Sequence, residues 1–95
     1  MDEQRLSYAF GKAEKRMPAI LLAGLKRYYY DKIPTGTFLR AVLENNLSQA
    51  ILGADSENLK LIYEIVSFIY DELPENCWGS PEKVANWLNK NPIQV

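Results

Sequence analysis

The sequence predicts an all-α domain, and three observations support that class. Apolar residues recur at spacings of three and four along most of the chain, with polar residues between them. All five prolines and three of the five glycines fall between these periodic stretches or at their ends, where helices begin and end. No stretch alternates apolar and polar residues over the length of a strand. We therefore expect a compact bundle of about five helices, with a kink or break at Pro18 and a short C-terminal helix after a Gly-Ser-Pro turn.

The size and composition are those of a single soluble domain spanning residues 1–95. A hydrophobic fraction of 47% beside 24% charged residues is enough for a core and argues against disorder. The single cysteine, Cys77, cannot form an internal disulfide, and the longest apolar run, residues 19–25, is too short to cross a membrane. The N-terminus lacks the apolar segment of a signal peptide. We expect no membrane contact and a cytoplasmic location.

Two helices are predicted before residue 31. An amphipathic helix places Leu6, Phe10, Ala13 and Met17 on one face, and Pro18 ends it. A second helix spans about residues 18–30, with the proline tolerated in its first turn. Its buried stripe is formed by Ile20, Leu21, Leu25 and Tyr28.

Two short helices follow the break at Ile33-Pro34. Thr35 or Thr37 is expected to cap the first, because its hydroxyl can accept an unpaired backbone N–H. Its apolar face is Phe38, Leu39, Val42 and Leu43. Ser48 is expected to cap the second, and Gly53 closes it; its apolar residues are Leu47, Ala50 and Ile51.

The strongest helical pattern covers residues 55–73, with Asp55 as its cap and Pro74 as its end. A helix apolar on so much of its circumference is central to the fold, or its spare face meets another subunit. After a turn-rich link, Ser80-Pro81-Glu82 is a strong start for the last helix. Val84, Trp87 and Leu88 are expected to dock that helix.

Charge is distributed unevenly along the chain. Residues 1–40 contain eight Lys/Arg and four Asp/Glu, a net charge of +4, whereas residues 41–95 contain three and eight, a net charge of −5. Such a dipole can steer an anionic partner to the first half or pair two copies. The alternative is that the charged residues lie on the solvated rim of a domain whose two halves fold against each other.

The sequence argues against an enzyme. It contains no histidine, the residue most used for proton transfer near neutral pH and for zinc binding. Without a histidine, Cys77 lacks its usual activating base, and we interpret it as a partly buried loop thiol. The glycines of the chain match neither a phosphate loop nor a dinucleotide fingerprint. No catalytic residue, metal ligand or cofactor is predicted.

Two segments are candidate binding sites. The helix start after Pro34 offers backbone N–H groups, hydroxyls and a guanidinium to an anion, whereas the simpler interpretation is that the threonines only cap and Arg40 pairs with Glu44. Trp78, at a glycine turn, could stack on a ligand or fill the gap between the last two helices. The candidate ligand-binding residues are Thr35, Gly36, Thr37, Arg40, Lys26, Trp78 and Ser80.

Aromatic residues mark a candidate protein interface. Three consecutive tyrosines point in three directions on a helix, so at least one is expected to face solvent or a partner, although packing at the rim of the core is the common alternative. The candidate interface residues are Tyr28, Tyr29, Tyr30, Tyr63, Phe68 and Tyr70.

Two dense clusters resemble a family of short proteins encoded by tailed phages and prophages. They are Pro34-Thr35-Gly36-x-Phe38-Leu39-x-Ala41-Val42-Leu43-x-Asn45 and Pro74-x-x-Cys77-Trp78-Gly79-Ser80-Pro81-Glu82-x-Val84-x-x-Trp87-Leu88. The resemblance makes residues 17–90 the family core and residues 1–16 an extension. Lys32 and Thr37 stand where the family pattern has glycine. The family has no assigned activity, so the resemblance implies a host-cell cytoplasmic setting and no chemistry.

The leading hypothesis is a non-enzymatic phage-type protein that works by protein–protein contact, as a homo-oligomer and against a host or defence protein. The first alternative is a sponge that sequesters a cyclic nucleotide or similar anion. The second is a nucleic-acid-binding regulator, which the acidic composition makes unlikely.

Overall fold

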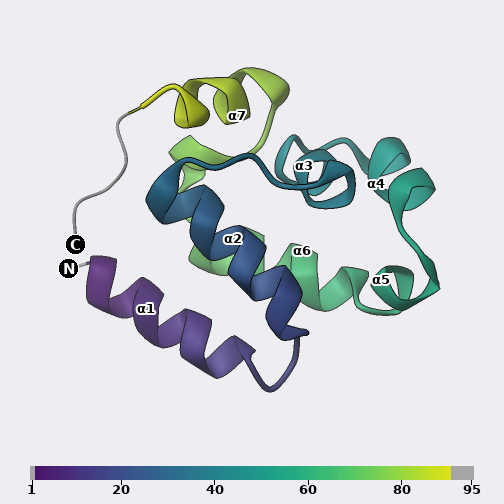
Figure 1. Ribbon diagram of the computed structural model, residues 1–95, viewed down its shortest axis with the longest axis horizontal. Coiled ribbons are helices and arrows are strands. Elements are labelled where there is room, and N and C mark those ends of the chain that lie inside the picture. The colour runs from purple at the N-terminus through teal and green to yellow at the C-terminus, as the bar shows by residue number, and fades with distance from the viewer. Residues whose placement is uncertain (1, 91–95) are drawn as a thin grey trace.

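The computed structural model describes residues 2–90, and within that range the chain folds into seven α-helices and one 3-10 turn, with no strand. Figure 1 labels the α-helices. Their bounds are α1 Asp2–Ala13, α2 Ala19–Asp31, α3 Thr37–Leu43, α4 Leu47–Gly53, α5 Ser56–Lys60, α6 Ile62–Glu72, η1 Glu75–Cys77 and α7 Pro81–Leu88. The predicted all-α class is confirmed. None of the helices in this range is long and apolar enough to cross a membrane.

The helices surround one core that draws on both halves of the chain. In Figure 1, α2 crosses in front of α6, with α1 below and α7 above. Phe10 of α1 lies between Tyr30 of α2 and Phe68 of α6, at ring-centroid distances of 6.3 and 5.1 Å. The side chains with almost no exposed surface are Phe10, Leu25, Tyr28, Leu43, Ile65, Ile69, Cys77 and Val84.

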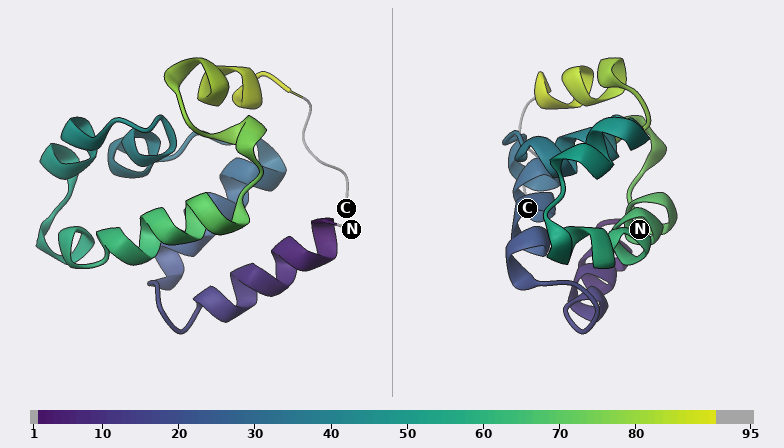
Figure 2. Two further views of the ribbon diagram at one scale, coloured as in Figure 1. Left: turned by 180° about the vertical axis from the view of Figure 1, so that it is seen from behind. Right: turned by 90° about the vertical axis from the view of Figure 1, so that its right-hand side faces the viewer.

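A second group of short helices forms one end of the molecule. The rear view in Figure 2 shows α3 and α4 above α6, with α5 joining the two levels at that end. α3 and α4 pack closely against each other, and α7 contacts both α3 and η1. This arrangement places α4 and α6, which are separated by α5 in the sequence, on one side of the molecule.

The predicted break between the first two helices is confirmed, but the first helix stops before Pro18 and leaves Met17 outside it. α1 ends at Ala13, and Pro18 is the N-cap residue of α2, not a member of its first turn. The expected burial of Ile20 is wrong, because its side chain is 78% exposed. The inward face of α2 is instead formed by Leu21, Leu22, Leu25, Tyr28 and Tyr29.

The single helix predicted over residues 55–73 is divided at Leu61, and this helps to raise the helix count above five. Leu61 has φ −101° and ψ 4°, and its N–H bonds to the carbonyl of Asn58 at 3.1 Å. Leu61 and Ile62, the two residues at the break, both pack against the core.

Three of the predicted helix starts can be compared with the observed caps. The Asp55 carboxylate accepts from the N–H of Asn58 at 2.8 Å, so that prediction is confirmed. The predicted Ser48 cap is wrong, because the side-chain oxygen of Asn46 accepts from the N–H of Gln49 at 3.2 Å. The threonine caps are also wrong. Gly36 is the N-cap residue of α3, and no side chain caps that helix.

Candidate functional site

A concave surface with a largely apolar lining lies between α4 and α6, and we call it the α4–α6 groove. It has a volume of about 300 Å³. It is lined by Val42, Asn45, Asn46, Leu47, Ala50, Ile62, Val66, Ile69, Tyr70 and Trp78. None of these residues is charged, and the whole stretch 45–54, which includes α4, carries no charge.

The turn between α3 and α4 builds one wall of the groove. Asn45 has φ +61°, a left-handed conformation that asparagine tolerates better than most residues. The Asn45 N–H donates to the carbonyl of Val42 at 3.0 Å, and the Asn46 N–H donates to the carbonyl of Ala41 at 2.9 Å. This pair of bonds is a Schellman motif, which ends α3 and turns the chain back. Asn46 then caps α4, so two adjacent asparagines end one helix and begin the next.

An aromatic pair forms the edge of the groove at its other end. The rings of Tyr70 and Trp78 are 5.6 Å apart and tilted by 57°. The Trp78 indole N–H donates to the carbonyl of Leu73 at 3.3 Å, which fixes the ring. Gly79 has φ +121°, which favours glycine, and its N–H bonds to the carbonyl of Leu43 at 2.7 Å. Trp78 is therefore held against α3 and α6 by the backbone on both sides.

The groove is flanked by large side chains that the fold leaves uncovered. Tyr63, Val66 and Tyr70 lie at i, i+3 and i+7 of α6, and their exposed fractions are 76%, 44% and 71%. Leu47 and Ile51 of α4 are 67% and 43% exposed. A cluster of exposed apolar residues beside a concave surface is typical of a contact site.

Three residues of the candidate anion site share one hollow, and Arg40 does not line it. Thr35, Gly36 and Thr37 line a separate hollow of about 380 Å³, which shares no residue with the α4–α6 groove. The Thr35 hydroxyl donates to the carbonyl of Gly36 at 3.2 Å. Arg40 lies outside that hollow, and its Nε donates to the Glu44 carboxylate at 2.9 Å, which is the simpler arrangement considered above.

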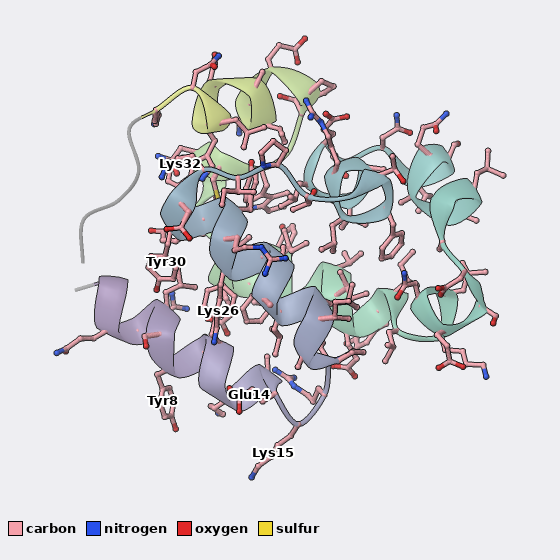
Figure 3. The ribbon with its side chains drawn as sticks, in the orientation of Figure 1. Tyr8, Glu14, Lys15, Lys26, Tyr30 and Lys32 are labelled. Atoms are coloured by element: carbon pink, nitrogen blue, oxygen red, sulfur yellow. The ribbon has the colours of Figure 1, made fainter. Side chains whose placement is uncertain are left out.

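The other candidate ligand residues are also dispersed. Lys26 points from α2 toward α1, with its ammonium 5.7 Å from the centroid of the Phe10 ring (Figure 3). The Ser80 hydroxyl accepts from the N–H of Lys83 at 3.1 Å and caps α7, as the sequence predicts. Of the seven candidates, only Trp78 lines the α4–α6 groove. The sequence left open whether its two candidate segments meet, and in the structure they do not line one pocket.

Of the six candidate interface residues, two are largely exposed and three are in the core. Tyr63 and Tyr70 are exposed, and Tyr30 is partly buried against Phe10. Tyr28, Tyr29 and Phe68 are at most 5% exposed, so they lie in the core and are not available to a partner; Tyr28 is part of the predicted buried stripe of α2. The rings of Tyr29 and Trp87 stack at 5.2 Å, so α7 covers a face of α2 that the local sequence alone leaves open.

A buried lysine at the end of α2 was not predicted as part of any site. Lys32 has φ +59° and is only 9% exposed. Its ammonium lies 3.8 Å from the centroid of the Trp87 ring and donates to the carbonyl of Tyr29 at 3.0 Å. Figure 3 shows Lys32 at the end of α2, below α7. The one available signal was that a glycine is usual here in the family that the sequence resembles, and glycine favours a positive φ.

Cys77 lies in the interior, and its thiol donates to the carbonyl of Pro74 at 3.1 Å. Burial raises the pKa of the Cys77 thiol to about 12. A thiol needs to ionise to act as a nucleophile, so this one is inert near neutral pH. Within residues 2–90, no three His, Cys, Asp or Glu side chains are grouped closely enough to hold a metal ion.

Comparisons with known proteins give no relative: no protein-family model, curated protein or solved structure matches the chain. Its function is therefore argued from the geometry of the α4–α6 groove.

Proposed function

We propose that this chain is a small non-enzymatic binding protein that acts by protein–protein contact, with the α4–α6 groove as its contact surface. One observation carries the proposal: an uncharged groove bordered by tyrosine, tryptophan and aliphatic side chains that the fold leaves uncovered. Contact surfaces between proteins are enriched in aromatic residues and depleted of charge at their centre.

The groove has the features of an anchoring site. Tyr70 and Trp78 offer large, rigid rings that lose little side-chain freedom on binding. Val66 and Leu47 lie on opposite walls, so an inserted side chain would be enclosed by apolar groups on both sides. Asn45 and Asn46 at the edge supply neutral hydrogen-bonding groups, which suit the polar rim of an interface.

The resemblance to short phage and prophage proteins supplies the setting for this proposal. In that setting the chain works in the cytoplasm of a host cell, and its target is a host or anti-phage defence component. The inert Cys77 thiol supports binding without chemistry, because the one cysteine of the chain does not ionise near neutral pH.

The anion-sponge alternative has less support than protein–protein contact. Arg40, its main cation, is paired with Glu44, and the Lys26 ammonium lies over the Phe10 ring of α1. Isothermal calorimetry with cyclic di- and trinucleotides tests it directly. The nucleic-acid alternative predicts DNA binding that weakens steeply with salt. It rests on the basic residues Lys12, Lys15, Arg16, Lys26 and Arg27.

Photo-crosslinking tests the proposed contact surface. A photoreactive phenylalanine in place of Tyr70 should give adducts with protein when the chain is expressed in bacterial cells and irradiated. The same substitution at Tyr8 is a matched control, because Tyr8 is 69% exposed but lies on α1. Adducts at position 70 that Val66→Lys removes support the proposal. No adduct, or equal yields at positions 70 and 8, overturns it.

A further inference from the structure

We infer that the occupant of the α4–α6 groove is a second copy of this chain, in a symmetric dimer to which each copy contributes the same face. This inference rests on the proposed contact surface and names the partner at that surface; a host or defence component would then contact another face of the dimer.

The absence of charge in the groove is the first argument. In a symmetric contact each patch faces a copy of itself, so a charged lining would place like charges near each other. None of the ten lining residues is charged, and neither is any residue of α4. This lining meets the electrostatic requirement for self-pairing, and it offers no charge with which to select a charged partner.

The available area is the second argument. When fully buried, an aliphatic side chain contributes roughly 60–120 Å² and an aromatic one roughly 150–250 Å². Weighted by their exposed fractions, the five flanking side chains offer roughly 400 Å² per copy; they are Leu47, Ile51, Tyr63, Val66 and Tyr70. A standard interface takes about 800 Å² from each partner, and roughly 65% of a homodimer interface is apolar. The flanking residues thus supply most of the apolar centre, and Trp78 and the neutral polar residues of 45–54 extend it.

The charge distribution gives the symmetric dimer a distinctive salt dependence. The groove is built from residues 42–78, within the half of the chain that carries a net charge of −5 over residues 41–95. A symmetric contact brings the acidic segments of two copies near each other. Arg5 and Arg16 pair with Glu72 and Glu64 within each copy, and added salt screens the repulsion that remains and strengthens association. A head-to-tail contact between the basic half of one copy and the acidic half of the next would weaken with salt.

Sedimentation equilibrium of the purified chain tests the inference. We expect a species of twice the chain mass whose dissociation constant falls as salt rises. Leu47→Lys should raise the dissociation constant at least about tenfold, because it places a charge in the contact. Ile20→Lys is the matched control, since Ile20 is 78% exposed on α2 and Leu47 is 67% exposed on α4. Circular dichroism confirms folding of both variants. If Leu47→Lys does not fold, the pair Tyr70→Ser and Tyr8→Ser provides the same comparison.

Three results overturn the inference: a monomer at all concentrations, a dimer that Leu47→Lys and Tyr70→Ser leave intact, or a dimer that dissociates as salt rises. The crosslinking experiment separates these failures from failure of the proposed function. A monomeric chain with Tyr70 adducts to a different protein overturns the second copy and supports the contact surface. A monomeric chain with no adduct overturns both.

Discussion

The phenol hydroxyl of Tyr28 donates a hydrogen bond of 2.6 Å to the carbonyl oxygen of Cys77, 49 residues further along the chain. The carbonyl of Tyr28 accepts a second bond, from the indole N–H of Trp87 at 3.1 Å. One residue of α2 therefore holds both η1 and α7. Because Cys77 adjoins Trp78, these bonds also position the aromatic edge of the α4–α6 groove. Burial raises the pKa of the Tyr28 phenol, so the hydroxyl stays protonated and remains a donor.

Tyr28→Phe should reduce the free energy of unfolding by about 1–3 kcal/mol, because it leaves the buried Cys77 carbonyl without its donor. Urea denaturation followed by circular dichroism measures the change. Tyr63→Phe is the control, since Tyr63 is exposed and should change stability by less than about 0.5 kcal/mol. Equal effects of the two substitutions would contradict this role for the Tyr28–Cys77 bond.

Lys32 combines an unfavourable backbone with favourable side-chain contacts, and two substitutions separate them. Lys32→Ala keeps the positive φ but removes the contacts with Trp87 and the Tyr29 carbonyl, so we expect a loss of about 1–3 kcal/mol. Lys32→Gly removes the same contacts but relieves the left-handed backbone, which is worth about 1 kcal/mol. Chemical denaturation should therefore rank the glycine variant above the alanine variant. A glycine variant no more stable than the alanine variant would exclude the backbone contribution.

The sequence was sufficient where a signal and its partner are close in the chain. Pro18 separates α1 from α2, Asp55 caps α5, and Ser80-Pro81 begins α7, as predicted. Prediction failed where two neighbouring residues could serve as the cap. Asn46 was used in place of Ser48, and the choice depends on the Schellman turn that precedes it. The break at Leu61 has no proline or glycine to mark it in the sequence.

The candidate site depends on contacts that local periodicity does not encode. The pattern shows that α6 is apolar on several faces, but not that α4 would approach it to form a groove. Likewise, Tyr28 and Tyr29 appear as possible interface residues until α7, more than 50 residues later, covers them. Lys26 and Arg40 are close enough in sequence to be candidates for one anion site, yet they have different partners in the fold.

The buried Cys77 thiol should make the protein less stable in alkali. Burial raises its pKa from 9.0 to about 12, so between these values the unfolded chain ionises the thiol and the folded chain does not. The contribution is fully present below pH 9 and is lost as pH rises toward 12. Urea midpoints at pH 8, 9, 10 and 11 should fall more steeply for the wild type than for Cys77→Ala. Parallel slopes, or rapid thiol labelling of the native protein at pH 8, would contradict this burial.

The cap at Ser80 should contribute to both stability and the shape of the groove edge. Its hydroxyl accepts a hydrogen bond from the N–H of Lys83 and fixes the first turn of α7. That helix places Val84 and Trp87 in the core. Ser80→Ala should cost about 1 kcal/mol, whereas Ser80→Asp should be close to neutral, because a carboxylate caps as well as a hydroxyl and favours the helix dipole. Thermal and urea unfolding measure both variants. If alanine and aspartate are equally destabilising, the hydroxyl acts through a contact other than the cap. If both are neutral, α7 is held by Trp87 and Val84 alone.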